Sequence, residues 1–426
     1  MINKIILGVC LLSLSGAYAQ QGTASPYSYF GTGDQKFKGT NEIKTMGSLA
    51  VYQDSIHLNT LNPASYASLQ KTSLSLGFTR TAGQLKTSNV TEKSTRSSFD
   101  YFALAFPVSN KIGVSLGIMP STFVGYNIAN LNKVGDQTIS NEYQGEGGIN
   151  RTYIGLGYKI NSNFNIGAEI AYNFGDTKNK NTKFIADDGN GFLIDRGSQE
   201  IINNDYRGIT INTAVSYSKL FKNNMKFDVA VTYSPETTLK NKVTGTLSTV
   251  SYNSVGSLTV IDQTELTSSK RDIISPQKYS FGVGYGKKHK WYLGAEYTGI
   301  QNSKLNESYG KIQNATFEDS HRFGLGGFYT PKYNSFNSYF DRLTYRFGLK
   351  YENTGLVVNT ESINDSSISL GFGFPVGLNR DSSNINLGLE YGKKGTKNNG
   401  LIQENYFNIS IGFSLNDKWF QKRKYE

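Results

Sequence analysis

The sequence predicts an all-β protein, a 14-stranded antiparallel transmembrane β-barrel with an N-terminal plug inside the lumen. Three observations lead to this fold class: repeated alternation of apolar with small or polar residues, an even number of such stretches, and short connections that alternate with long ones. Residues 163–175 show the alternation best, because Phe164 and Ile166 share one strand face while Gly167 and Glu169 share the other. A tilted strand needs about ten residues to cross a bilayer, which is close to the length of this stretch.

The first 19 residues read as a secretory signal peptide. Lys4 supplies the positive charge, residues 5–14 form the apolar core, and a small-x-small cleavage site ends at Ala19. Lipidation of Cys10 is an alternative, although it would need a small residue where Val9 stands. No cysteine follows Cys10, so we expect a secreted chain without disulfides.

The net charge of +11 has two interpretations. Basic chains bind nucleic acids, but lysines in the loops of a barrel also meet anionic lipid headgroups or keep the protein solvated. The lysines cluster in expected loops, for example Lys178, Lys180 and Lys183. We therefore expect the outer-membrane lipid bilayer as a partner and no nucleic acid.

Residues 20–70 do not alternate and form the expected plug segment. The stretch opens with a turn-rich aromatic run at 25–34 and closes with Asn62, Pro63 and Ala64. Such a long irregular segment normally needs a surface to lie on, and the inside of a barrel offers one.

The expected barrel covers residues 71–415 and is followed by a periplasmic tail at 416–426. An even strand count brings both ends of a bacterial barrel to the same side of the membrane. The apolar faces of the fourteen strands lie within residues 74–78, 102–106, 112–118, 154–158, 164–174, 209–217, 227–233, 279–285, 291–297, 323–329, 343–351, 368–374, 385–391 and 407–413.

Connection lengths support the barrel independently. Short turns are expected near residues 109–110, 161–162, 222–224 and 286–290, and long outside loops at 127–148, 177–205 and about 240–275. A soluble sandwich or propeller also has short strands and regular turns. The signal peptide, the even count and the loop asymmetry favour the barrel.

The inward positions are small or charged. Glycine pairs such as Gly155 with Gly157 and Gly324 with Gly326 either relieve crowding in a narrow barrel or make room for the plug segment. Charges at inward positions need partners, so we expect ion pairs across the lumen or to the plug, unless water fills a channel there. These expected lumen charges are Glu169, Asp228, Glu296, Arg346, Lys350, Glu352 and Glu390.

Pro120 lies late in the expected third strand, shortly after Gly117. Proline has no N–H for the strand ladder and is normally confined to edges, strand starts or bulges. Pro120 therefore marks either the point where the strand leaves the membrane or a bulge or gap in the barrel wall. We take Pro120 and Gly117 as candidates for a lateral opening.

Together these features resemble the FadL-type outer-membrane transporters of hydrophobic compounds. Residues 25–31 and 62–67 look like the Bacteroidetes branch of that family, and the residues after Asp417 look like tails common there. The resemblance implies an N-terminal hatch that includes Asn62, Pro63 and Ala64, and a kinked third strand that forms a lateral exit.

The resemblance also implies localisation in the outer membrane of a Gram-negative bacterium. The leading function is passive uptake of hydrophobic small molecules such as long-chain fatty acids. Some relatives in the same branch are components of type IX protein secretion, so an accessory or structural barrel of a secretion or assembly machine, with such proteins as partners, is the alternative. A general polar porin is disfavoured because the plug would obstruct it.

Catalysis finds little support in the sequence. A barrel hydrolase needs a serine activated by a histidine in the same wall, yet His57, His289 and His321 are dispersed and lie in no nucleophile motif. Their spacing also fits no metal site. We expect no enzyme activity, no cofactor and no metal.

Overall fold

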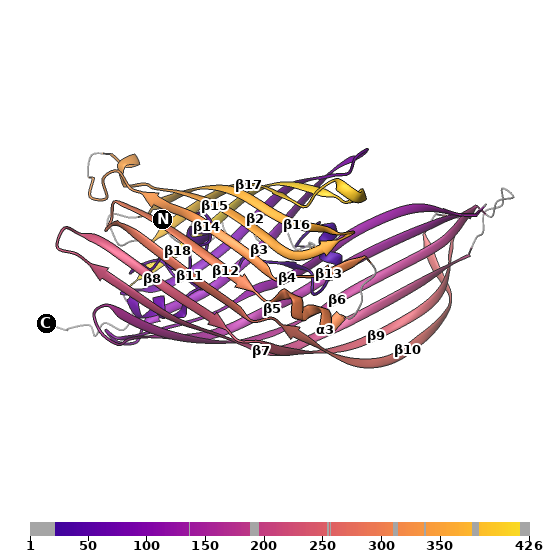
Figure 1. The fold of residues 1–426 in the computed structure, drawn as a ribbon, viewed down its shortest axis with the longest axis horizontal. Coiled ribbons are helices and arrows are strands. Elements are labelled where there is room, and N and C mark those ends of the chain that lie inside the picture. The colour runs from indigo at the N-terminus through magenta and orange to yellow at the C-terminus, as the bar shows by residue number, and fades with distance from the viewer. Residues whose placement is uncertain are drawn as a thin grey trace.

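The computed structural model contains one sheet that closes on itself (Figure 1). It describes residues 22–135, 137–187, 196–253, 255, 257–309, 314–335, 338–376 and 383–417. The expected signal peptide and most of the expected C-terminal tail lie outside these residues. None of the helices in the described ranges is long and apolar enough to cross a membrane.

Most described residues belong to strands. The barrel strands are β2 (Thr72–Lys86), β3 (Thr91–Pro107), β4 (Ile112–Val134), β5 (Gln137–Lys159), β6 (Phe164–Asp187), β7 (Arg196–Leu220), β8 (Met225–Ser234), β9 (Thr237–Tyr252), β10 (Leu258–Ser275), β11 (Lys278–Lys287), β12 (Trp291–Ile300), β13 (Ala315–Phe317), β14 (Ser320–Tyr329), β15 (Thr344–Val358), β16 (Glu361–Pro375), β17 (Asn384–Lys394) and β18 (Gln403–Asp417). The N-terminal segment contains η1 (Pro26–Tyr29), β1 (Asp34–Gln35), α2 (Asn41–Lys44) and η2 (Pro63–Ser68), while η3 (Asn302–Lys304), α3 (Leu305–Tyr309), η4 (Phe340–Arg342) and η5 (Asn398–Gly400) lie between barrel strands.

These strands make a closed barrel of fourteen. β8 with β9, β10 with β11, and β13 with β14 each form one interrupted barrel strand, because each pair shares the same neighbouring strands. Pro235 and Pro276 stand at two of the interruptions, where proline removes an N–H from the ladder. β18 pairs with β2 from Gln403 to Asp417 and closes the barrel, which confirms the predicted 14-stranded antiparallel fold.

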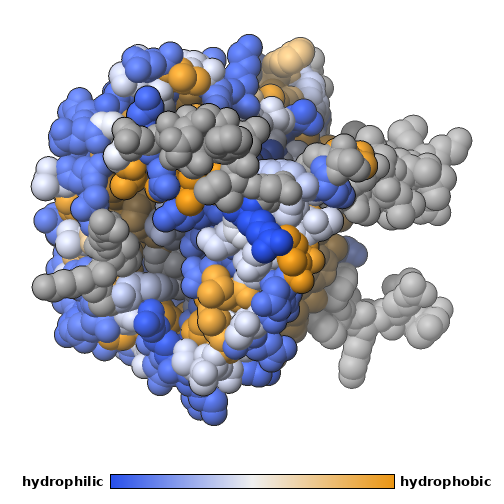
Figure 2. All heavy atoms as spheres, turned by 90° about the vertical axis from the view of Figure 1, so that its right-hand side faces the viewer, coloured by the Kyte–Doolittle hydropathy of each residue, from blue (hydrophilic) through white to orange (hydrophobic). Residues whose placement is uncertain are grey.

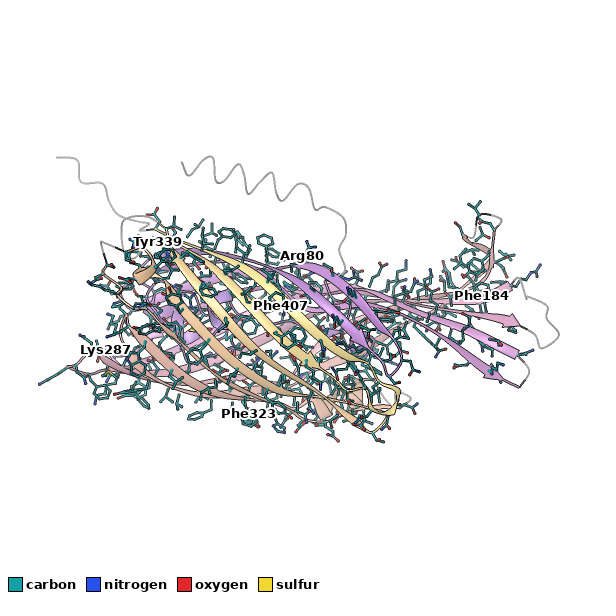
Figure 3. The ribbon with its side chains drawn as sticks, turned by 90° about the horizontal axis from the view of Figure 1, so that it is seen from above. Arg80, Phe184, Lys287, Phe323, Tyr339 and Phe407 are labelled. Carbon is teal, nitrogen blue, oxygen red and sulfur yellow. The ribbon has the colours of Figure 1, made fainter. Side chains whose placement is uncertain are left out.

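The outward face carries a band of exposed apolar side chains. Phe323 is 54% exposed, Leu370 50% and Ile409 41%, although each belongs to a regular paired strand. In Figure 3, Phe323 and Phe407 lie on the barrel wall between the end that carries Lys287 and Tyr339 and the far end at Phe184. Such a band is what the outside of a membrane barrel requires.

Much of the three expected long loops is regular strand instead. β4, β5, β6 and β7 are 23 to 25 residues long and extend with β9 and β10 well beyond the other strands (Figure 1). The loop prediction was wrong because polar residues there suggested irregular chain, whereas cross-strand pairs such as Glu146 with Lys178 and Lys240 with Asp272 place opposite charges together. Seen from this end, hydrophilic residues predominate on the surface (Figure 2).

Leu370→Arg is expected to destabilise the barrel by about 2–4 kcal/mol, because its side chain faces outward in the middle of the apolar band of β16. The measurement is urea unfolding in lipid vesicles. Ser366→Arg is the matched control, since it lies on the same face of β16 but nearer the outer end. If both variants lose equal stability, the band does not contact lipid at Leu370.

Candidate functional site

The N-terminal segment, residues 22–71, lies against the inward faces of strands around the barrel. η2 contacts β4, β5 and β6, while α2 contacts β16, β17 and β18. Ile43, Met46, Leu49 and Tyr66 are fully buried. The segment therefore forms a core with the inner wall that an amphipathic barrel could not form by itself.

Asn62, Pro63 and Ala64 lie at the centre of this contact. The Asn62 Oδ1 accepts a hydrogen bond from the Ala64 amide at 3.0 Å, and its Nδ2 donates to the Ala50 carbonyl at 3.0 Å. A Cβ at Gly167 would lie 2.3 Å from the Pro63 carbonyl carbon, so only glycine permits this approach. Asn62 thus starts η2, and an inward glycine gives η2 its place.

Four of the expected lumen charges contact the N-terminal segment. Glu169 accepts a hydrogen bond from the Tyr66 hydroxyl at 3.0 Å, Asp228 from Gln53 at 3.4 Å and Glu296 from the Val51 amide at 3.1 Å. The fourth, Glu390, lies 3.7 Å from the Lys44 ammonium.

Wall partners complete these contacts. Glu169 also pairs with Arg151, and Asp228 with Lys226 at 3.0 Å. Segment and wall therefore share buried polar groups that are costly to separate. Arg151, Lys226 and Lys44 were not among the predicted site residues. The two-residue strand period places Lys226 on the same face as Asp228 and could have indicated it, whereas Arg151 and Lys44 pair with carboxylates on other elements.

The other three lumen charges lie on β15. The Arg346 guanidinium donates to the Asn386 Oδ1 at 2.9 Å, and Asn386 in turn donates to Glu42 of α2 at 2.7 Å. Lys350 pairs with Asp365 at 2.8 Å. Glu352 stands opposite Arg322 and Asp365 in the strand register. Arg346 is thus connected to the segment through Asn386, whereas Lys350 pairs with another wall residue.

The wall separates between β3 and β4, close to Gly117 and Pro120. β3 and β4 pair only from Pro107 with Gly113 to Phe102 with Ile118, although β4 continues to Val134 along β5. The β4–β5 register shifts between Pro120 and Thr122, as expected for a bulge that bends a strand. We call this separation the β3–β4 seam.

The N-terminal segment enters the seam. β1 pairs antiparallel with β4, Asp34 opposite Phe123 and Gln35 opposite Thr122. On the other side, the Arg96 Nε of β3 donates to the Thr23 carbonyl at 3.4 Å. A two-residue strand of polar residues gave no signal in the sequence, because its partner is decided by the barrel around it.

Lys38 places a cation in the lumen. Its ammonium makes no hydrogen bond or ion pair among the described residues, and its side chain is half-buried. Burial, together with repulsion from Arg151 and Lys278, lowers the pKa of Lys38 to about 7. Arg151 of β5 and Lys278 of β11 supply these two cations, and Glu169, which pairs with Arg151, acts on the pKa of Lys38 in the opposite direction.

The histidines occupy separate environments. The His57 Nδ1 lies 2.6 Å from the Asp54 carboxylate inside the N-terminal segment, and the His321 Nδ1 lies 2.8 Å from the Tyr297 hydroxyl on the outer wall. His289 stacks on Tyr333 with ring centroids 4.4 Å apart. Across the described ranges, no three His, Cys, Asp or Glu side chains gather as a metal site would require.

Comparison with known proteins identifies a family and a fold. A family model described as BamG matches residues 1–426, whereas no curated protein matches the chain. The CymD monoaromatic hydrocarbon channel superposes with a TM-score of 0.58 and 13% identity, over 89% of this chain and 98% of that one. The toluene transporter TodX of P. putida gives 0.57 and 15%, over 90% and 100%. A Pseudomonas aeruginosa FadL homologue gives 0.54 and 12%, over 91% and 100%.

Proposed function

This chain belongs to the BamG family and has the FadL-like fold, and from its wall and lumen we propose that it is an outer-membrane channel for passive uptake of hydrophobic small molecules. The N-terminal segment is the hatch that closes the lumen, and the β3–β4 seam is the lateral exit. The observation that carries the proposal is the loss of β3–β4 pairing beyond Ile118, where the segment replaces β3 as the partner of β4.

A lateral exit suits an apolar substrate. A molecule that leaves the lumen through the wall enters the hydrocarbon layer directly, without crossing the periplasm. Leu116 and Ile118 are 37% and 39% exposed on the outward face just before the seam begins, so the opening adjoins the apolar band. A polar porin would gain nothing from such an opening.

Lys38 supports an amphipathic substrate with an anionic headgroup, such as a long-chain fatty acid. A carboxylate beside this ammonium would replace the repulsion from Arg151 and Lys278 with an attraction. The names of the structural neighbours, a toluene transporter and a monoaromatic hydrocarbon channel, support the wider class of hydrophobic compounds. We assign no catalytic step to the chain, since transport down a gradient needs none.

A second candidate function is an accessory or structural barrel in a protein secretion or assembly machine of the outer membrane. The extended strands β4–β7, β9 and β10 favour it, because they offer a large surface outside the barrel for other proteins. The resemblance to the Bacteroidetes branch and to type IX secretion components remains a prediction from the sequence.

Removal of the bulge tests the uptake function. The variant Pro120→Val with Ser121 deleted is expected to let β4 pair with β3 past Ile118 and to abolish most uptake of a fluorescent fatty acid into proteoliposomes. Pro375→Val is the matched control, because Pro375 ends β16 far from the seam along the sheet. Uptake that survives in a folded bulge-free barrel would contradict the lateral exit.

A further inference from the structure

The start of the described chain runs from the seam to the hairpin of β17 and β18, which β2 and β3 separate from the seam in the sheet. We define the strap as residues 22–36. On the seam side, besides the β1–β4 pairing, the Lys36 amide donates to the Ser121 carbonyl at 2.9 Å and the Gly125 amide donates to the Ser28 Oγ at 3.1 Å. The strap therefore takes hydrogen-bonding positions on β4 that β3 leaves empty.

The strap is held at the hairpin of β17 and β18 by polar contacts. The Lys394 ammonium lies 2.5 Å from the Asp34 Oδ1, with only 13% and 25% of the two side chains exposed. The Tyr27 hydroxyl donates to the Ile402 carbonyl at 2.6 Å, and the Ser25 hydroxyl donates to the Glu404 carboxylate. Burial would raise the pKa of Asp34, but Lys394 and Lys36 keep it below its ordinary value, so the pair is ionised.

Apolar contacts accompany these polar ones. Tyr27 is 6% exposed and packs with Phe317, Leu356, Ile363 and Leu401 at the outer ends of the barrel strands. The Lys394 ammonium also lies 5.9 Å from the centre of the Tyr27 ring, within reach of a cation–π attraction. The hairpin thus holds the strap at a point distant in sequence from the seam that the strap fills.

We propose that the strap is a latch-held closure of the β3–β4 seam, in which the Asp34–Lys394 ion pair is the latch. Asp34 is also the β1 residue opposite Phe123, so one residue joins the latch to the seam. When the pair breaks, β1 is no longer bound to the β17–β18 hairpin through Asp34. The strap then separates from β4, and the wall opens beyond Ile118. This inference names the regulation of the lateral exit and rests on the proposed function only for what then passes through.

Hydrogen exchange of the full-length protein in nanodiscs tests the latch without any substrate. In Asp34→Asn and in Lys394→Gln, amides of residues 33–36 are expected to exchange on the order of tenfold faster, because a partly buried pair is broken. The charge swap, Asp34→Lys with Lys394→Asp, should restore slow exchange. Arg207→Gln is the control, since it breaks an exposed ion pair on β7 that does not touch the strap.

Fatty-acid uptake by the same variants separates the two proposals. Faster exchange together with faster uptake supports both the latch and the exit. Faster exchange with no uptake in any variant leaves the latch standing and overturns the uptake function. Unchanged exchange in both single variants, or equal acceleration in Arg207→Gln, overturns the latch. A heat-dependent shift in gel migration shows which variants are folded. If Asp34→Asn does not fold, comparing the exchange of Lys394→Gln with that of the charge-swap variant still tests the latch.

Discussion

A chain that lacks residues 23–61 is expected to fold into an open barrel that conducts ions, whereas the full-length chain stays closed. The ladder closes between β18 and β2 without the segment, so deletion removes inner contacts but no barrel strand pair. Water then fills the space left by the deleted residues and hydrates Asp228 and Glu296, whose partners Gln53 and Val51 are removed. η2 stays on the inner faces of β4, β5 and β6, but the rest of the lumen of this fourteen-stranded barrel is then open to small ions and polar solutes.

Single-channel recording in planar bilayers measures this effect. The control is Arg207→Gln, which breaks an exposed ion pair on β7 and should leave the barrel closed. Equal, low conductance of the segment deletion and the full-length protein would show that the segment is not a plug. The accessory-barrel function would then gain support.

Binding of decanoate is expected to weaken as the pH rises above 7. Protonated Lys38 attracts the carboxylate, and bound carboxylate raises the pKa of Lys38, so binding takes up a proton above its free pKa of about 7. Affinity is therefore highest below pH 7 and falls by up to about tenfold for each pH unit above it. Calorimetric titration of the detergent-solubilised protein between pH 6 and pH 9 measures the change.

Two variants identify the group responsible for this pH dependence. Lys38→Met should bind decanoate weakly at every pH and lose the slope. Lys183→Met, on the exposed extension of β6, should keep both affinity and slope. A slope that persists in Lys38→Met would assign the proton to another group and remove Lys38 from the binding site.

The alternation of side chains was sufficient to predict the barrel. A strand buries or exposes every second residue, so Phe164, Ile166 and Ile170 could be assigned to one wall face and Glu169 to the other from spacing alone. The same parity assigned Glu296 and Arg346 inward, where the structure buries both. Local chemistry likewise marked Asn62 as the start of a turn and Pro120 as a break in the ladder.

Long-range pairing was beyond such local rules. Residues 127–148 were expected to be a loop, but 127–134 and 137–148 extend β4 and β5, where polar residues pair across strands and Glu146 stands opposite Lys178. The partners of Glu169 and Asp34, which are Arg151 and Lys394, come from barrel positions that no local spacing connects.

By itself, the sequence determined which residues form the wall and which face of the wall each one occupies, because both follow from a two-residue period along the chain. Only the tertiary structure decided where the N-terminal segment runs, that β1 replaces β3 beside β4, and that Lys38 lies near Arg151, Lys278 and Glu169. Those features depend on the closure of the sheet, which brings residues hundreds of positions apart within hydrogen-bonding distance.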